Sequence, residues 1–252
     1  MASEQAMTLR DHLEELRRRL TITAVFVVAT TAAAFAFRDR LLAWLLRPGF
    51  DQVDFKPVYT EVAELVGVVM KVAFTAGLVF AMPVVLLQVV LFIAPALTRQ
   101  EKTYLYLMLP GTLLAFLGGV LFGYYVIFPP AFNFLFTFEA EYADPTIRIS
   151  SYINVLTMMM FWMGVVFELP VVMFLLARVG VLTPRMLHRF RRFAYVLAFV
   201  VGAIITPTFD PVNQALVAVP VIVLYELGIG LAWVGQRLRG ATPAAAKVPA
   251  RR

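Results

Sequence analysis

Residues 65–94, which read LVGVVMKVAFTAGLVFAMPVVLLQVVLFIA, decide the fold of this chain. They contain one charged side chain, Lys71, and no run of polar residues. The hydrocarbon core of a bilayer is about 30 Å thick, and an α-helix needs about 20 apolar residues to cross it. This stretch is therefore predicted to be a transmembrane helix.

The same composition extends over the whole chain. Of its 252 residues, 61% are hydrophobic and 15% are charged, and the mean hydropathy is +0.82. Soluble domains contain about 45–50% apolar and about 25% charged residues, so one soluble core could not bury this much apolar surface. We therefore predict an all-α membrane protein with six transmembrane helices, at about residues 20–37, 65–94, 104–128, 152–177, 193–206 and 213–234. The fifth stretch is shorter than a span normally needs, which requires local thinning of the bilayer or support from neighbouring helices.

The distribution of basic residues predicts the orientation. If the N-terminus lies inside, most of the 22 Lys and Arg residues fall on the side of both termini, as the positive-inside rule requires of the cytoplasmic side. Residues 1–19 are predicted to form a cytoplasmic amphipathic helix on the inner surface, because leucines recur at helical spacing from Leu9 to Leu20. Residues 20–235 then form the transmembrane domain. Residues 236–252, rich in Ala, Pro and basic side chains, are predicted to be a disordered cytoplasmic tail.

Two long loops are predicted on the outer side. Residues 38–64 contain the apolar segment 41–46, which is too short to span a bilayer and is followed by Pro48. We expect this segment to form an interfacial helix. Residues 129–151 are rich in phenylalanine and are expected to cover the outer mouth of the helices.

Several classes of chemistry are excluded or disfavoured. The chain has no cysteine, which excludes disulfides and cysteine-based metal sites. Its two histidines, His12 and His188, are far apart and have no evident ligand partner. The sequence has no phosphate-binding loop motif, no His–Glu metal motif and no nucleophile–base arrangement. We therefore predict that the protein is not an enzyme, has no catalytic or metal site, and needs no cofactor.

Two acidic residues of the mainly basic inner segments, Glu15 and Glu101, are candidates for function. Glu15 precedes three consecutive arginines, and local pairing with them would be worth about 0.2–0.5 kcal/mol per pair. Glu101 follows Thr98 at the spacing of a capping box, which is a sufficient structural role. Alternatively, each carboxylate could grip a guanidinium through charge-assisted hydrogen bonds. Both interpretations remain open for both residues.

Glu168 is the strongest single polar signal within a predicted span. It lies in the sequence MGVVFELP at residues 163–170, and a charge at the bilayer centre costs about 2.5–3.5 kcal/mol on insertion scales. It is either a protonated group bonded to a neighbouring helix or part of a functional polar groove, and Pro170 predicts a kink beside it. Gln214 and Glu226 are weaker signals of the same kind, whereas Asp210 is most simply a turn residue.

Five motifs together resemble the TatC family, the core receptor subunit of the twin-arginine protein translocase. The order and spacing of these motifs match that family over roughly residues 9–235. The motifs are HLEELRRR at 12–19, FIAPAL at 92–97, FELP at 167–170, Thr206-Pro207 followed by Asp210 and Gln214, and YELG at 225–228. The resemblance implies a glove-like bundle of six helices with a concave face and both termini in the cytoplasm.

The resemblance also implies a receptor site at the cytoplasmic face. It would bind the twin-arginine signal peptides of folded proteins before they cross the membrane. Glu15 and Glu101 match the carboxylates that recognise the signal, and Arg17 and Phe92 belong to the same site.

Further roles follow from the same resemblance. Glu168, with Gln214, is expected in an intramembrane polar groove, and Pro48 and Asp210 match outer-side positions related to transport. Glu226, at the inner end of the last helix, is an expected partner contact. The partners would be single-span TatA- and TatB-type proteins in a multi-subunit complex that uses the protonmotive force. The expected location is a bacterial-type cytoplasmic membrane, in contact with lipid and without nucleic acid.

Two other classes of function are alternatives to a translocase receptor. A proton-coupled secondary transporter would use Glu168 as its proton site, but such transporters usually contain inverted repeats, and no repeat is evident. An intramembrane enzyme would need paired catalytic groups, and Glu168 and Glu226 are the only acids within the predicted spans. The translocase receptor is the leading hypothesis.

Overall fold

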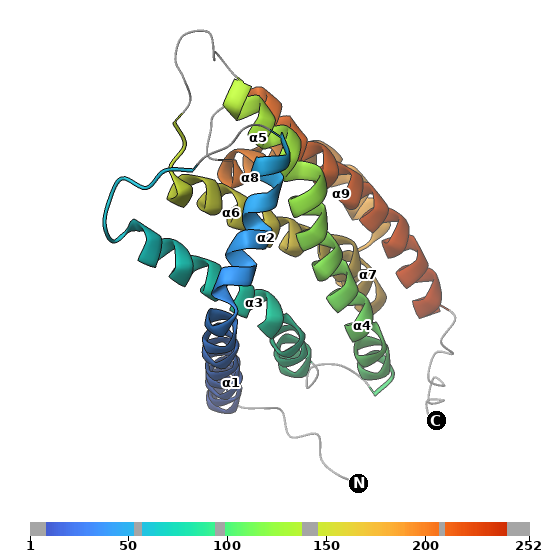
Figure 1. The fold of residues 1–252 in the computed structure, drawn as a ribbon. Helices are drawn as coiled ribbons and strands as arrows, with labels where there is room; N and C mark the ends of the chain where they lie inside the picture. The colour runs from blue at the N-terminus through green and yellow to red at the C-terminus, as the bar shows by residue number, and fades with distance from the viewer. Residues whose placement is uncertain (1–8, 53–56, 94–98, 138–145, 207–209, 241–252) are drawn as a thin grey trace, which may run out of the picture. The chain divides into compact units, whose positions relative to one another are not determined.

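The computed structural model describes residues 9–52, 57–93, 99–137, 146–206 and 210–240. Within these residues every regular element is a helix (Figure 1), so the all-helical prediction is confirmed. The only extended pairing among them is one parallel bridge between Val58 and Arg148. The chain divides into two compact units, residues 1–164 and 165–252.

The first unit is built around the pairing of two long helices, α1 and α3. Thr30 Oγ1 on α1 donates a hydrogen bond to the Gly77 carbonyl on α3 at 2.8 Å. A Cβ added at Gly77 would lie 2.5 Å from the Thr31 Cα, so no larger residue fits there. Small residues allow this close approach between membrane helices. The elements of this unit are α1 (Leu9–Ala36), α2 (Arg38–Gln52), α3 (Glu64–Ile93), α4 (Arg99–Phe122), the π-helical turn η2 (Gly123–Ile127), α5 (Phe128–Thr137) and most of α6 (Ile149–Phe167).

Helix α1 differs from the prediction of a separate amphipathic helix over residues 1–19. It runs without a break from Leu9 to Ala36, because this stretch contains neither glycine nor proline. Its amphipathic beginning and its apolar remainder are one helix, so residues 9–19 do not form a separate surface helix. Residues 1–8 lie outside the described part of the chain.

Two predicted loops also contain more helix than expected. The apolar segment 41–46 belongs to the 15-residue helix α2, which includes Pro48 in its interior. The third predicted span contains η2 near its end and continues past Phe128 through α5 to Thr137. Pro129 and Pro130 follow Phe128 and the π-helical turn η2, so the two prolines and the irregular turn lie together within one helical stretch.

The second unit packs three helices around a small apolar core. Its elements are α7 (Leu169–Val179), α8 (Pro184–Ile205) and α9 (Pro211–Gly240). The core consists of Met173 and Ala177 on α7, Leu187 on α8, and Ile229 and Ala232 on α9.

The structure refines the fourth predicted span and corrects the predicted tail. The span over 152–177 lies within the single candidate span Ile149–Val179, but one turn residue, Glu168, separates α6, which ends at Phe167, from α7, which begins at Leu169. Pro170, in the first turn of α7, explains the new start there. Helix α9 continues to Gly240, so the predicted tail over 236–252 begins with helix, and residues 241–252 lie outside the described part.

Within the described residues, five helical stretches are long and apolar enough to cross a bilayer. They are His12–Ala36, Glu64–Phe92, Tyr106–Thr137, Ile149–Val179 and Pro211–Leu238. Helix α8 is not among them: its first half carries Arg185, Arg189, Arg191 and Arg192. The count of six spans therefore stays a prediction, and so does the cytoplasmic location of both termini.

Candidate functional site

The first candidate site is the seam between α1 and α3 at the N-terminal end of α1. His12, Glu15 and Arg19 are spaced three and four residues apart, so they lie on one face of α1. The His12 ring packs on the Phe92 ring of α3 with centroids 4.7 Å apart. One turn earlier on α3, Gln88 contacts Arg19. The face of α1 that carries Glu15 therefore packs against α3.

Glu15 already binds a guanidinium in this structure. Its Oε1 accepts a hydrogen bond from Arg19 Nη2 at 2.8 Å, while Arg19 Nη1 donates to Gln88 Oε1 at 3.0 Å. The Glu15 and Arg19 side chains are 18% and 23% exposed, so solvent reaches the pair only in part. One carboxylate and one amide oxygen therefore receive the two ends of a planar guanidinium, the arrangement that arginine favours.

Arg17 and Glu101, the other charged residues predicted for this site, are not seen in contact with Glu15 within the part of the chain that the structure describes. The Arg17 side chain is exposed and makes no ion pair with Glu15 among the described residues, where Arg19 holds that carboxylate. Glu101 lies in the first turn of α4, but its side chain is outside the described part, as is Thr98. Gln88 was not predicted, although an isolated amide four residues before Phe92 in an apolar stretch is a detectable signal.

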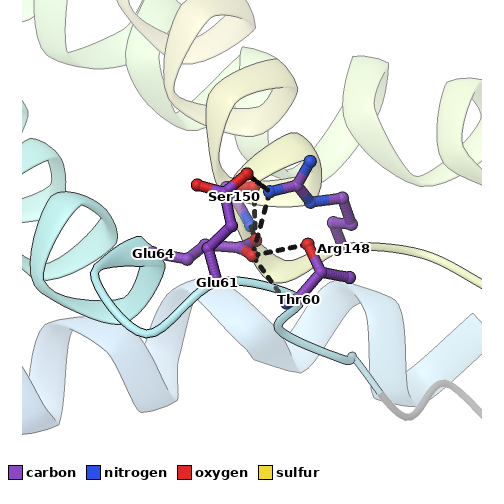
Figure 2. A network of polar contacts seen from close by, with 5 residues as sticks. All are labelled: Thr60, Glu61, Glu64, Arg148 and Ser150. Carbon is purple, nitrogen blue, oxygen red and sulfur yellow. Dashed lines mark hydrogen bonds and ion pairs between the residues drawn. The ribbon is translucent and has the colours of Figure 1, made fainter.

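A second polar cluster fixes the segments that precede α3 and α6 (Figure 2). The Glu64 side chain is only 3% exposed. Its Oε2 accepts hydrogen bonds from the Thr60 amide at 2.8 Å and from Arg148 at 3.1 Å. Its Oε1 accepts one from the Ser150 hydroxyl at 2.5 Å. The bond to Glu64 raises the pKa of Arg148 above its ordinary value, and the exposed Glu61 adds a second ion pair at 3.2 Å.

The two predicted outer-side residues have clear local environments. Pro48 is buried in the interior of α2, where it interrupts the helix hydrogen bonding. Asp210 caps α9: its Oδ1 accepts a hydrogen bond from the Asn213 amide at 2.7 Å, and Pro211 occupies the first helical position. The geometry of Asp210 therefore matches the simpler interpretation, that of a turn and cap residue.

Glu168 and Gln214 are not held together by hydrogen bonds. Gln214 Nε2 donates to the Phe199 carbonyl of α8 at 2.8 Å. Glu168 lies at the junction of α6 and α7, and its buried Oε1 has no hydrogen-bond partner among the described residues. Pro170 lies against Gly228 of α9, and Gln214 precedes Gly228 by 14 residues, or about 21 Å of helix. Glu168 and Gln214 thus lie at different levels of the second unit.

Glu226 lies near the middle of α9 (Pro211–Gly240) and not at its inner end as predicted, and it links α9 to α8. It accepts a hydrogen bond from the Tyr195 hydroxyl at 2.6 Å and forms an ion pair with Arg191. An open groove of about 650 Å³ begins beside Glu226, and its wall is almost entirely apolar. The lining residues are Pro170, Ile222, Val223, Glu226, Leu227, Gly230, Leu231 and Val234.

Comparison with known proteins gives one consistent result. A family profile described as "Sec-independent protein translocase protein (TatC)" matches residues 11–220. The chain is 37% identical over 235 residues to the TatC protein of Koribacter versatilis, covering 91% of this chain and 86% of that one. It is 33% identical over 234 residues to the chloroplastic TATC protein of Arabidopsis thaliana, covering 93% and 68% respectively. A crystal structure described as the twin arginine translocase receptor TatC superposes with a TM-score of 0.82 and 34% identity, covering 90% of this chain and 100% of that chain.

Proposed function

The chain belongs to the TatC family and is a core component of a Sec-independent, twin-arginine protein translocase; from this premise we propose that its α1–α3 seam binds the paired arginines of a signal peptide. The resemblance found in the sequence is thereby confirmed. Its function is protein transport and not catalysis, and its long apolar helices make it a membrane protein.

The observation that carries the proposal is the guanidinium already bound at Glu15. Arg19 is held by a carboxylate oxygen at 2.8 Å and by the Gln88 amide oxygen at 3.0 Å. An incoming arginine can take over the same two acceptors if Arg19 rotates away. The neighbouring Phe92 and His12 rings then offer an aromatic surface to the peptide. Glu101, at the start of α4, is proposed to hold the second arginine.

The remaining parts of the proposal concern topology and partners. The basic residues of the expected inner segments support a topology with both termini in the cytoplasm of a bacterial-type cell and the protein in its cytoplasmic membrane. Single-span TatA- and TatB-type proteins would bind the second unit, where an apolar groove lies beside Glu226. Folded cargo would then cross the membrane at the expense of the protonmotive force, with Glu168 contributing during passage.

The proposal is tested by peptide binding to the full-length protein in detergent. A synthetic signal peptide with an Arg-Arg pair should bind more tightly than the same peptide with Lys-Lys. In Glu15→Ala we expect about fivefold weaker binding of the Arg-Arg peptide, because a charge-assisted bond is lost but the Arg19 pair no longer has to be broken. Glu101→Ala should weaken binding similarly. Equal affinity of both peptides for the unmodified protein would contradict the proposal.

Arg19 should behave as a competitor of the signal peptide. Replacing it with alanine frees the Glu15 carboxylate, and we expect the Arg-Arg peptide to bind about two- to fivefold more tightly, since a partly exposed pair is worth about 0.3–1 kcal/mol. Arg18→Ala is the matched control, because it removes the same charge from an exposed neighbour on the same helix. Isothermal titration of both variants measures the difference. The same change in both would mean that only net charge matters.

A further inference from the structure

Helix α2 contains a proline where an α-helix normally needs a backbone donor. Pro48 is the eleventh residue of the 15-residue helix Arg38–Gln52, so it lies well inside the helix. Proline lacks the N–H that would donate to the carbonyl four residues earlier, and its ring crowds that carbonyl. In α2 the affected carbonyl belongs to Trp44. A carbonyl that is shielded from water by the surrounding helices needs another donor, because an unpaired buried backbone group is costly.

Tyr124 supplies the missing donor. Its hydroxyl, on the π-helical turn η2, donates a hydrogen bond to the Trp44 carbonyl at 2.6 Å. The Tyr124 ring stacks on the Trp44 ring with centroids 4.1 Å apart and planes 14° from parallel. Tyr124 is only 2% exposed, so its side chain has a fixed position. A side-chain hydroxyl from another helix thus takes the place of the N–H that Pro48 lacks.

Tyr152 bridges the next pair of backbone groups in α2, the Gly49 amide and the Leu45 carbonyl. Its hydroxyl accepts a hydrogen bond from the Gly49 amide at 2.9 Å and donates one to the Leu45 carbonyl at 3.1 Å. Gly49 and Leu45 are four residues apart, so the hydroxyl joins the two groups that a regular helix would pair directly. The Tyr152 ring is held edge-on between Phe128 at 5.2 Å and Phe132 at 5.1 Å.

We infer that Tyr124 and Tyr152 are positioning residues that replace the backbone hydrogen bonds disturbed by Pro48 and so fix the backbone of α2 around this proline. Tyr152 lies in the first turn of α6, directly after Arg148 and Ser150, which grip Glu64. The backbone of α2 around Pro48 is therefore tied, through Tyr152, to the segments that precede α3 and α6. A role of this segment in transport rests only on the family resemblance, in which Pro48 matches a transport-related position; the replacement of hydrogen bonds does not depend on that role.

The inference is tested by a double-mutant cycle on the full-length protein in detergent. Tyr124→Phe removes the hydroxyl and keeps the ring, and we expect the melting temperature to fall by about 3 °C. In a Pro48→Ala background the alanine N–H can donate to the Trp44 carbonyl, so adding Tyr124→Phe should then cost less than about 1 °C. Tyr125→Phe is the matched control. Tyr125 is the next residue along the chain and is 62% exposed, so its substitution should leave the melting temperature unchanged in either background.

Hydrogen exchange supplies a second measurement that does not depend on overall stability. In Tyr152→Phe the Gly49 amide loses its acceptor, and we expect its exchange to accelerate relative to amides at the start of α2. Equal losses from Tyr124→Phe in both backgrounds, with unchanged exchange at Gly49, would overturn the inference. If the coupling is seen but Pro48→Ala exports cargo normally, the inference stands and the transport role that the family resemblance implies for Pro48 falls.

Discussion

Replacing Gly119 with alanine should lower the melting temperature of the detergent-solubilised protein by about 5–10 °C. An added Cβ at Gly119 would lie 2.4 Å from the Met163 carbonyl oxygen and 2.8 Å from the Gly164 Cα. These are backbone atoms of α6, which cannot rotate away as a side chain can. Helices α4 and α6 would have to separate, with the loss of their packing.

The adjacent glycine is the control for this prediction. An added Cβ at Gly118 would meet nothing within 4 Å. Alanine has a higher helix propensity than glycine by about 1 kcal/mol, so Gly118→Ala should leave the melting temperature unchanged or raise it slightly. Thermal unfolding of both variants, followed by circular dichroism, compares two identical substitutions one residue apart. Similar losses in both would show that helix propensity or detergent effects, and not contact with α6, decide the outcome.

The helical architecture could be predicted from composition alone. A run of about 20 apolar residues has few structural alternatives in a membrane, and the described helices cover much of each predicted span. The ends and interruptions could not be predicted in the same way. The break at Glu168 and the continuation past Pro129 depend on where a proline falls within a turn, and hydropathy does not measure that.

The contacts between helices were harder to predict from the sequence than the helices themselves. Gly119 and Gly123 are four residues apart, the spacing of close helix contacts in membranes, and both approach the backbone of α6. That spacing does not say which helix is the partner. The hydroxyls of Tyr124 and Tyr152 were also unpredictable, because their acceptors are backbone carbonyls of α2, far away in the sequence.

The candidate receptor site was predictable in part. The motif around Glu15 indicated a carboxylate that can hold an arginine, and the structure shows a guanidinium at that carboxylate. The sequence could not choose among three consecutive arginines, because all three lie within helical reach of Glu14 or Glu15. The contact with Gln88 on α3 makes that choice in favour of Arg19.

Glu168 should show opposite effects on stability and on transport. Its buried Oε1 has no hydrogen-bond partner among the described residues, and leaving such a group unpaired costs about 1–3 kcal/mol. Glu168→Leu removes the polar group at similar size, so the protein should melt at the same temperature or a few degrees higher. We nevertheless expect the export rate to fall by about tenfold or more, because a carboxylate that bonds a polar group during passage contributes about 1.5–3 kcal/mol.

A second variant, Glu168→Gln, and the signal-binding assay show why export falls in Glu168→Leu. The amide keeps a hydrogen-bonding group but cannot ionise, so export by Glu168→Gln shows whether polarity or charge is required. Binding of the Arg-Arg peptide should be unchanged in both variants, because the proposed docking site lies on α1 and α3. A natural protein retains a destabilising buried group when function requires it. Normal export by Glu168→Leu, together with a higher melting temperature, would leave Glu168 without a role in transport.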